Sequence, residues 1–470
     1  MPDEFDVIVI GAGPAGENAA GRAGRGGLSV AIVEGDLAGG ECAYWACVPS
    51  KALLRPVELA AEVRRMPGLE VGPIDAGAVL ARRDEAVSHY DDAGQVHWIE
   101  GVPATFVRGW GGLDGPQRVR VAEPGGGSRL LTARHAVVLA TGSYAAVPPV
   151  PGLAEAEPWT SHEVTAVKAI PERLAVIGGG VVACEMAQAM HGLGAARTTI
   201  LVRGDRLLPR MEPFASDLVA ESFAASGIEV RTGTGVVRVE RPVPGGPVTV
   251  HLTSGPPVEA DELLVATGRR PATDGLGLAS VGLPADRVVE VDDSMRATGV
   301  DGGWLYAVGD INGRALLTHM GKYQARVCGD VIAARARGER DDLPSLRDTA
   351  DAYGAPQVVF TDPQVCAVGR TEAQARAEGF PVRAVEYDLG AVTGAYLLGD
   401  GYRGRAGAVV DTERRVLLGV TFVGPGAADL LHAATIAVTA EVPLDRLWHA
   451  VPTFPTVSEI WLRLLETYGL

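Results

Sequence analysis

Short apolar runs that end in glycine-rich turns dominate the first half of the chain. The run at 6–10 leads into a glycine-rich turn at 11–16, a segment with helical spacing comes next, and a second apolar run covers 28–33. Fully apolar strands that alternate with helices are typical of a parallel sheet covered on both faces. The pattern therefore predicts an α/β fold that begins with a strand, a helix and a second strand.

The first turn has the spacing G-x-G-x-x-G, formed by Gly11, Gly13 and Gly16. Between a strand and a helix, such glycines make a tight turn, admit a pyrophosphate and let the helix pack closely, while the helix N-terminus faces the phosphates. Glu34 ends the second strand, where it can accept hydrogen bonds from a ribose diol. The stretch predicts a dinucleotide site, which a merely glycine-rich turn would not provide.

A second unit of the same kind begins at 174. Its turn has the spacing G-x-G-x-x-A, formed by Gly178, Gly180 and Ala183, and its second strand is expected at 198–202. The chain is therefore expected to bind two dinucleotides.

The end of that second strand carries no acidic residue; Arg203 and Arg206 come after it instead. Arginine can hold a 2′-phosphate with charge-assisted hydrogen bonds, whereas a carboxylate would repel it. We expect NADPH to be preferred, with NADH possible. The alternative is a solvated surface, and Asp205 stands between the two arginines.

The tripeptide Ala-Thr-Gly comes after an apolar strand twice, with Thr141 and Gly142 in the first copy and Gly268 in the second, as an internal duplication would produce. A further strand ends in Asp310, where a carboxylate can meet a ligand hydroxyl. A helix expected from Thr318 would aim its positive end at a group that acquires negative charge. Taken alone, Asp310 is better explained as a turn cap.

Other segments complete the expected architecture. Helical spacing covers 51–65 and 76–97, and strand character extends over 229–241. Beyond a change of composition at 341–356, mixed strands and helices predict an α+β unit.

Composition narrows the class of partner. The 470 residues are 47% hydrophobic and carry a formal charge of -16 without a basic run. This acidity argues against nucleic acid or an anionic membrane surface as a partner and leaves small molecules or proteins. No basic segment with an apolar one after it opens the sequence, so we expect a cytoplasmic protein.

Cys42 and Cys47 are separated by four residues, about one helical turn, so their sulfurs could bond and cycle between dithiol and disulfide. The spacing alone would equally fit buried small residues or half a metal site. Five cysteines are too few for a disulfide framework in so long a chain. We expect Cys184, Cys328 and Cys366 to be core residues.

In this order, the paired fingerprints, the C-x4-C-x-P-S-K segment, the Ala-Thr-Gly turns and the Ala-Val-Gly-Asp element resemble the flavoprotein disulfide reductases. That family includes lipoamide dehydrogenase, glutathione reductase and mercuric reductase. The resemblance implies an FAD-binding domain at 1–150 and 271–345, an NAD(P)H-binding domain at 151–270, and a dimerisation domain at 346–470. It also implies a homodimer in which each subunit completes the active site of its partner.

The resemblance assigns roles as well. Cys47 would face the flavin, Cys42 would meet the substrate, and Lys51 and Glu185 would pair beside flavin N5. Hydride from NADPH would reduce the flavin, which would open the disulfide so that the Cys42 thiolate could attack a small-molecule electrophile. The nucleotide-binding residues implied are Gly11, Gly13, Gly16, Glu34, Thr141, Gly142 and Asp310 for FAD, and Gly178, Gly180, Ala183, Arg203, Arg206 and Gly268 for NADPH. No metal is implied.

The chain departs from the family pattern at its end. Phe454 stands where a histidine usually acts as acid and base, while Glu459, its expected partner, remains. Losing a positioned acid/base typically costs ~10²- to 10⁴-fold in rate, so rapid lipoamide or glutathione turnover is not expected. Tyr44 and Trp45 between the cysteines suggest an aromatic substrate site, and Val181 replaces the usual gating tyrosine.

The sequence supports four hypotheses. The first is an FAD-dependent NADPH oxidoreductase that acts on a disulfide or related sulfur electrophile with atypical acid/base chemistry. The second is a flavin-only NADPH oxidase or quinone-type reductase. The third is C–S cleavage like that of ketopropyl-coenzyme M oxidoreductase/carboxylase, which similarly carries phenylalanine but also replaces the glutamate. The last is a non-enzymatic flavin sensor.

Overall fold

The structure is a computed structural model that describes residues 3–350 and 354–470. The chain forms two units, which are described one at a time. Unit 1 comprises Met1–Val48, Asp84–Tyr144 and Arg269–Asp351; unit 2 comprises Pro49–Arg83, Ala145–Gly268 and Ala352–Leu470. The predicted division into three domains is a different partition and stays a prediction.

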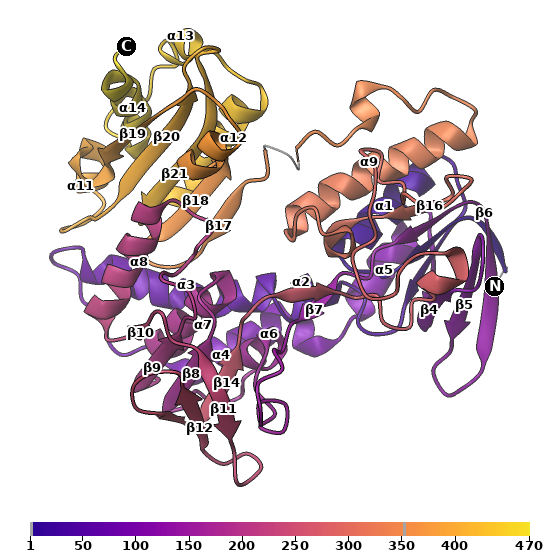
Figure 1. The fold of residues 1–470 in the computed structure, drawn as a ribbon, viewed down its shortest axis with the longest axis horizontal. Helices are drawn as coiled ribbons and strands as arrows, with labels where there is room; N and C mark the ends of the chain where they lie inside the picture. Colours follow the sequence, from indigo (N-terminus) through magenta and orange to yellow (C-terminus); the bar gives the residue numbers. More distant parts are fainter. Residues whose placement is uncertain (1–2, 351–353) are drawn as a thin grey trace. The chain divides into compact units, whose positions relative to one another are not determined.

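Unit 1 is built on one mixed sheet in the order β3-β2-β1-β6-β5-β4, with β16 paired to β6. Figure 1 labels β4, β5, β6 and β16 of this sheet. The ladders among β1, β2, β3, β6 and β16 are parallel, whereas β4 and β5 continue the sheet in antiparallel fashion. The strands are β1 (Glu4–Ile10), β2 (Val30–Glu34), β3 (Thr105–Arg108), β4 (Trp110–Leu113), β5 (Arg118–Ala122), β6 (Ser128–Leu139) and β16 (Leu305–Ala307).

Alternation along β1 explains how this sheet is covered. Val7 and Val9 share a buried cluster with residues of α1 (Pro14–Arg25) and α9 (Thr318–Ala336), whereas Ile8 lies in the cluster on the opposite face. Successive strand residues point to opposite faces, so an apolar strand buried on both sides needs no polar positions. The apolar run at 6–10 is thereby accounted for, and the predicted strand, helix and strand are confirmed.

Unit 2 contains a four-stranded parallel sheet in the order β10-β9-β8-β14. A separate antiparallel sheet joins β11, β12 and β13. The strands are β8 (Arg173–Ile177), β9 (Arg197–Leu201), β10 (Glu229–Arg231), β11 (Val236–Glu240), β12 (Val248–Leu252), β13 (Val258–Ala260) and β14 (Glu262–Val265). The helices that accompany them are α3 (Cys47–Arg64), α4 (Ala76–Ala86), α6 (Ser161–Thr165), α7 (Val181–Gly192) and α8 (Pro213–Ser226).

The C-terminal part of unit 2 is a five-stranded antiparallel sheet with helices, as the α+β prediction expected. Its strands are β17 (Gln357–Val359), β18 (Gln364–Gly369), β19 (Val382–Asp388), β20 (Arg405–Asp411) and β21 (Val416–Gly424). Its helices are α10 (Glu372–Ala377), α11 (Thr393–Tyr396), α12 (Leu431–Thr439), α13 (Leu444–Leu447) and α14 (Ile460–Tyr468).

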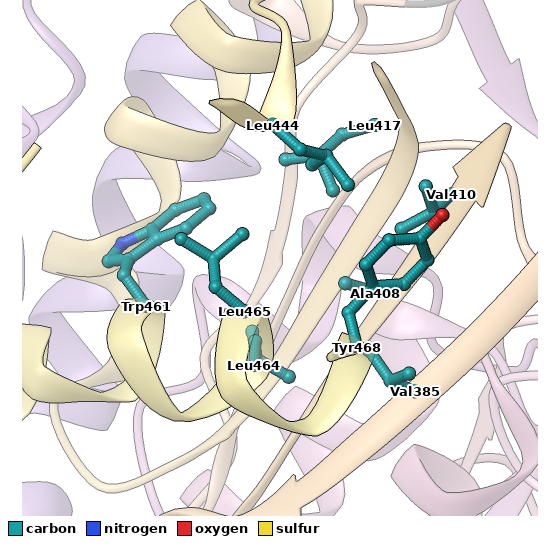
Figure 2. A pocket seen from close by; sticks show the side chains of 9 residues that line it. All are labelled: Val385, Ala408, Val410, Leu417, Leu444, Trp461, Leu464, Leu465 and Tyr468. Atoms are coloured by element: carbon teal, nitrogen blue, oxygen red, sulfur yellow. The ribbon is translucent and has the colours of Figure 1, made fainter. Parts of the chain in front are cut away.

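A small cavity lies beneath α14, between its apolar side chains and those of the sheet (Figure 2). Its volume is about 10 Å³, and Trp461, Leu464 and Val410 are among the residues that line it. Such a space holds about one water molecule at most, and an apolar lining offers that water few partners. The cavity is therefore a packing gap, not a substrate site.

The helical segment predicted at 76–97 is confirmed in part, because it is interrupted in the middle. The chain instead forms α4, a 3₁₀ turn at Ser88–Tyr90 and α5 (Ala93–Gly101). Ser88, His89 and Tyr90 have φ values of 51°, 53° and 63°, which a right-handed helix cannot contain. Tyr90 stacks on Trp45, with ring centroids 4.7 Å apart, and this contact lies too far along the chain for helical periodicity to reveal.

The predicted strand at 229–241 is two strands. β10 pairs in parallel with β9, whereas β11 pairs antiparallel with β12 in another sheet. Between them, Gly233 has a φ of 60°, a conformation that interrupts an extended strand. Over the described part of the chain, every helix is too short or too polar to span a bilayer.

Candidate active site

The first glycine turn is sterically closed to any side chain at two positions. Gly11 has a φ of 104°, and a Cβ there would lie 2.4 Å from the Ala140 carbonyl oxygen. A Cβ on Gly16 would lie 1.9 Å from the carbonyl oxygen of Gly11. Gly13 is the N-cap of α1, and no side chain caps that helix. The first-turn N–H groups therefore form a positive end that suits a pyrophosphate.

Glu34 fastens this turn to the second strand. Its Oε2 accepts a hydrogen bond from the Ala12 N–H at 2.8 Å, and its Oε1 accepts one from the Asp36 N–H at 2.8 Å. Burial raises the pKa of Glu34, while the backbone hydrogen bonds oppose that rise. Each carboxylate oxygen has a second lone pair, so the side chain can still accept a hydrogen bond from a ribose hydroxyl.

Asp310 belongs to a network that connects distant loops of unit 1. Its Oδ2 accepts a hydrogen bond from the Ser143 hydroxyl at 2.5 Å, and burial raises its pKa. Arg269 donates to the Ser143 hydroxyl at 2.6 Å and forms an ion pair with Glu41. Asp310 therefore has side-chain partners, which a simple turn cap would not explain.

Arg269 and Ser143 were not predicted from the sequence. Arg269 comes directly after Gly268, and Ser143 directly after Gly142, so each extends an Ala-Thr-Gly turn by one residue. Their place beside the repeated turns was the available signal. Thr141 stabilises the first Ala-Thr-Gly turn, because its hydroxyl donates a hydrogen bond to the Ala272 carbonyl at 2.7 Å.

The two candidate redox thiols lie at a break between helices, where one helical turn was expected. Cys42 is in α2 (Gly40–Tyr44), whereas Cys47 is the first residue of α3. Both are free thiols and are hydrogen-bonded to each other. The hydrogen bond with Cys47 and burial raise the pKa of Cys42, while Thr318 and Lys322 lower it.

Cys47 also contacts the beginning of α9. Its Sγ lies 3.3 Å from the Oγ1 of Thr318, the first residue of that helix. A helix N-terminus carries a partial positive charge that favours a nearby anion. Cys47 is thus placed where a thiolate would be stabilised.

The two aromatic residues between the cysteines differ in their surroundings. Tyr44 is buried, with 2% of its surface exposed, so it contributes to the core. Trp45 stacks on Tyr90 instead. The aromatic substrate site stays a prediction, and of its two residues only Trp45 lies outside the core.

In unit 2, Lys51 and Glu185 form the expected ion pair. The Lys51 Nζ lies 2.7 Å from the Glu185 Oε2, and the other oxygen of Glu185 accepts the Phe360 N–H at 3.0 Å. Glu185 is buried, and Lys51 lies 4.8 Å from the centroid of the Phe360 ring. The Lys51 ammonium and the Glu185 carboxylate each make a further contact with Phe360, and these contacts fix the position of the ion pair.

The second glycine turn repeats the geometry of the first. Gly178 has a φ of 128°, and a Cβ there would lie 2.2 Å from the Ala266 carbonyl oxygen. Gly180 is the N-cap of α7, no side chain caps that helix, and Ala183 is fully buried. Val181, which replaces the usual gating tyrosine of the family pattern, is 37% exposed.

The two arginines after β9 differ in what they contact. Arg203 is exposed and makes no hydrogen bond or ion pair with any residue that the structure describes. Arg206 donates to the Pro209 carbonyl at 3.4 Å, within its own loop. Arg203 is therefore the more available cation at the end of this strand.

Residues 5–327 match the family described as pyridine nucleotide-disulphide oxidoreductase. This region contains both glycine turns and the thiol segment. The dimerisation domain of the same family matches residues 355–464. The chain belongs to the pyridine nucleotide-disulphide oxidoreductase family. Enzymes of this family depend on FAD and use a pyridine nucleotide.

Similar proteins support the assignment of this chain to the family. Dihydrolipoyl dehydrogenase of Chlamydia muridarum is 32% identical over 470 residues, which cover 98% of this chain and 96% of that protein. Mercuric reductase of Staphylococcus aureus is 30% identical and covers 97% of this chain and 81% of its own length. LpdA of Mycobacterium tuberculosis is 26% identical, with a TM-score of 0.85 over 99% of this chain and 100% of that one.

The flavoprotein disulfide reductase RclA of Escherichia coli shares the fold, with a TM-score of 0.85 at 24% identity over 99% of both chains. The predicted fold class is therefore confirmed. The residues of unit 1 suit FAD. Its first glycine turn leads into the N-terminus of α1, which no side chain caps, and the Glu34 carboxylate stands at the end of β2.

The residues near the C-terminus lie within the family's dimerisation domain. Phe454 is 68% exposed, whereas Glu459 is buried. The Oε1 of Glu459 accepts a hydrogen bond from Arg463 at 2.5 Å, and its buried Oε2 has no partner among the described residues. The predicted partner of a missing histidine is thus held by an arginine one turn further along α14.

The described residues contain no group of three or more histidine, cysteine, aspartate or glutamate side chains that could hold a metal ion. Cys184, Cys328 and Cys366 are fully buried, as expected of core residues. Burial raises the pKa of the Cys366 thiol to about 12, so this thiol stays protonated and unreactive at neutral pH.

Proposed function

We propose that this family member is an FAD-dependent NADPH oxidoreductase whose Cys42 and Cys47 reduce a small-molecule disulfide or related sulfur electrophile. The observation that carries the proposal is the hydrogen-bonded pair of free thiols, with Cys47 3.3 Å from Thr318 at the N-terminus of α9. Two adjacent thiols can exchange with a disulfide, and the exchange needs one of them as a thiolate.

The residues of unit 1 divide the work between cofactor and substrate. We assign Gly11, Gly13, Gly16, Glu34, Thr141, Gly142 and Asp310 to FAD. Bound FAD would pass electrons from the nicotinamide to the thiol pair. Cys47 is assigned to the flavin side because it lies at the N-terminus of α9, and Cys42 is assigned to the substrate.

The residues of unit 2 are assigned to the pyridine nucleotide. Gly178, Gly180, Ala183 and Gly268 would hold its pyrophosphate, while Arg203, assisted by Arg206, would hold a 2′-phosphate. The absence of any partner for Arg203 among the described residues supports NADPH, since a free guanidinium can bind phosphate through two parallel hydrogen bonds. Lys51 and Glu185 are assigned to the neighbourhood of flavin N5.

The assembly is proposed to be a homodimer. Val451 and Phe454 are large exposed apolar side chains within the family's dimerisation domain, and exposed apolar surface can mark a protein–protein contact. We propose that Phe454 and Glu459 enter the partner's active site, and that FAD binds to 1–150 and 271–345, NADPH to 151–270, and the partner to 346–470. Free thiols suit a reducing compartment, which we take to be the cytoplasm.

The experiment is anaerobic NADPH oxidation with a panel of low-molecular-weight disulfides and, separately, a panel of quinones. Wild-type enzyme is expected to reduce at least one disulfide, and Cys42→Ser is expected to lower that rate by ~10³-fold or more, because the attacking thiolate is gone. Cys366→Ser is the matched control, since this buried thiol lies elsewhere and its loss should leave the rate unchanged. Equal rates in Cys42→Ser and wild type would contradict the proposal.

A second function, flavin-only quinone reduction, is favoured by Phe454, which cannot transfer a proton. In that case quinones would be reduced equally well by wild type and Cys42→Ser, and no disulfide would be reduced by either. The same two panels therefore separate the alternatives.

A further inference from the structure

Trp110 is the one large side chain in a run of glycines. The sequence at 109–112 reads Gly-Trp-Gly-Gly, and β4 begins at Trp110. The side chain is 63% exposed, and it makes no ring-stacking, cation–π or hydrogen-bond contact with another residue that the structure describes. A single exposed apolar side chain needs no explanation by itself, so the meaning of this one depends on what its ring lies against.

One face of the indole lies on Gly35. A Cβ added to Gly35 would lie 2.3 Å from Cδ2, 2.5 Å from Cε2 and 2.7 Å from Cε3 of Trp110. These are three neighbouring atoms of the six-membered ring, and similar distances to all three place that Cβ above the ring face and not beside its edge. Glycine is the residue that lets a ring come so close to the backbone. The exposed area of Trp110 therefore belongs mainly to the opposite face of the ring.

The glycines on either side hold Trp110 in this place. The Gly109 N–H donates a hydrogen bond to the Glu34 carbonyl at 2.8 Å, so the backbone before Trp110 is fastened to the end of β2. A Cβ on Gly111 would lie 3.1 Å from the Cγ1 of Val33, so the backbone after Trp110 packs closely on the same strand. Successive residues of a strand point to opposite faces. Gly111 therefore faces the sheet, and Trp110 points away from it.

The ring adjoins the carboxylate that we assign to a ribose. Glu34 directly precedes Gly35, and its Oε2 accepts a hydrogen bond from the Ala12 N–H within the first glycine turn. A turn that suits a pyrophosphate, a carboxylate that suits a ribose diol and an exposed aromatic face thus come one after another. The ADP half of FAD carries its pyrophosphate, its ribose and its adenine in the same order.

We propose that the exposed face of Trp110 stacks on the adenine of FAD and makes this site selective for a flavin that carries a base. The inference rests on the proposed assignment of Glu34 and the first glycine turn to FAD. An aromatic side chain and a nucleobase stack through their flat faces, without any hydrogen bond at the edge of the base. Trp110 is thus a contact residue for the cofactor and takes no part in the transfer of protons or electrons.

The first test is the rate at which FAD leaves the full-length holoenzyme, measured by the fluorescence of the released flavin after dilution. Trp110→Ala is expected to release FAD about 5- to 100-fold faster, because one base–aromatic stack is lost. Trp110→Phe keeps an aromatic face and should stay close to the wild-type rate. Trp98→Ala is the matched control, because Trp98 lies on α5 of the same unit and is 46% exposed. Its rate should equal that of wild type.

Two smaller ligands separate a stack on the adenine from a general loosening of unit 1. ADP contains the adenine but no flavin, whereas FMN contains the flavin but no adenine. In competition with FAD for the apoprotein, ADP should be about 5- to 100-fold weaker against Trp110→Ala than against wild type. FMN should compete equally against both proteins.

Gly35→Ala is the decisive variant, because it leaves Trp110 in the chain but takes away its place. The added methyl group would meet the indole at 2.3 Å, so the ring has to move. We expect Gly35→Ala to speed FAD release in wild type and to add nothing in Trp110→Ala, since two changes that act on one contact are not additive. Gly21→Ala is the matched control, because a Cβ there meets no atom within 4 Å. It should change neither rate.

Equal FAD release by Trp110→Ala and wild type would overturn the inference, and so would an additive effect of Gly35→Ala. Equal weakening of ADP and FMN would also overturn it, because the ring would then support the fold of unit 1. Dissociation of the dimer with unchanged FAD release would overturn it by assigning the ring to a contact between subunits.

The failure of this inference and that of the proposed FAD site are distinguishable. If Trp110 alone is misassigned, Gly11→Ala still yields protein without FAD while Trp110→Ala retains the wild-type release rate. If the site itself is misassigned, Gly11→Ala and Trp110→Ala both keep FAD as wild type does. Neither measurement needs turnover, so both are independent of which substrate the thiols reduce.

Discussion

The glycine turns of the two units are alike in backbone but differ in the side chains that accompany them. Gly11 and Gly178 both have positive φ values, and a Cβ at either would collide with the carbonyl of an Ala-Thr-Gly turn. In unit 1 the second strand ends in Glu34, whose carboxylate accepts a hydrogen bond from the Ala12 N–H. In unit 2 the corresponding strand leads to Arg203, which is exposed. On our proposal, this backbone turn holds a pyrophosphate in each unit, and the side chain after the strand selects the ribose that accompanies it.

The turns also differ in their neighbours. The Gly39 N–H donates to the Ala12 carbonyl at 2.8 Å, so the segment before Cys42 is fastened directly to the first turn. The second turn leads to the partly exposed Val181. The first turn is thus tied directly to the segment that carries the thiols, whereas the second turn has a partly exposed side chain beside it.

The largest effect is expected from a methyl group in the first turn. Gly11→Ala would have to adopt a left-handed conformation, costing about 1–2 kcal/mol, and would also place Cβ 2.4 Å from a carbonyl oxygen. We expect protein without FAD, measured by absorbance near 450 nm. Gly178→Ala, with the same clash in unit 2, should retain FAD and lose NADPH binding.

Gly21→Ala is the control for both, because a Cβ there meets no atom within 4 Å. It should retain FAD and NADPH. If Gly178→Ala lost FAD, or Gly11→Ala kept it, the assignment of one cofactor to each turn would be wrong.

Arg203→Glu is expected to have the next largest effect. Loss of a charge-assisted hydrogen bond of about 1.5–3 kcal/mol and the added repulsion should raise the KM for NADPH at least ~10-fold. The KM for NADH should change little. Arg197→Glu, an exposed arginine at the other end of β9, is the control. Equal changes for both nucleotides would refute a role in phosphate binding.

Glu34→Gln should have a smaller effect on FAD. The amide can still accept hydrogen bonds but carries no charge, so we expect a loss of about 1–2 kcal/mol and FAD binding ~5- to 30-fold weaker. Equilibrium dialysis of FAD against the apoprotein measures it. Unchanged FAD binding would show that this carboxylate only fastens the turn.

The smallest effect concerns stability. The folded protein raises the pKa of Glu17 from 4.5 to about 7, so the folded state holds the extra proton between these values. Stability from this group is therefore complete below pH 4.5 and declines as pH rises to 7. Glu17→Gln should melt about 1–3 °C above wild type at pH 8 and level with it at pH 5. A pH-independent difference would contradict the shift.

The parts of the site that are local in sequence could be predicted. Both glycine turns, Glu34 and the strands that lead into them result from steric and periodic rules that act over a few residues. Lys51 and Glu185 are far apart in sequence, so their pairing was predicted only from the family resemblance. The 2.7 Å distance between Nζ and Oε2 confirms that pairing. Glycine patterns are informative because few other residues fit a turn with positive φ.

The parts that depend on distant contacts could not be predicted. Arg269 meets Glu41 and Ser143, which are far away in sequence, and the stack of Trp45 on Tyr90 accompanies a left-handed turn within an apparently helical pattern. Glu17 comes after the glycine motif as an ordinary helix residue, and only packing reveals its burial. Periodicity reports which face is apolar and not which residue will cover it.

The central claim is that Cys47 and Cys42 form a redox-active pair that communicates with the flavin. Its most direct test is anaerobic titration of the FAD-loaded enzyme with NADPH, monitored by absorbance at long wavelength. The account predicts a charge-transfer band after two electrons in wild type and none in Cys47→Ser. Wild-type enzyme that shows no such band before its flavin is fully reduced, or Cys47→Ser with an undiminished band, would contradict it.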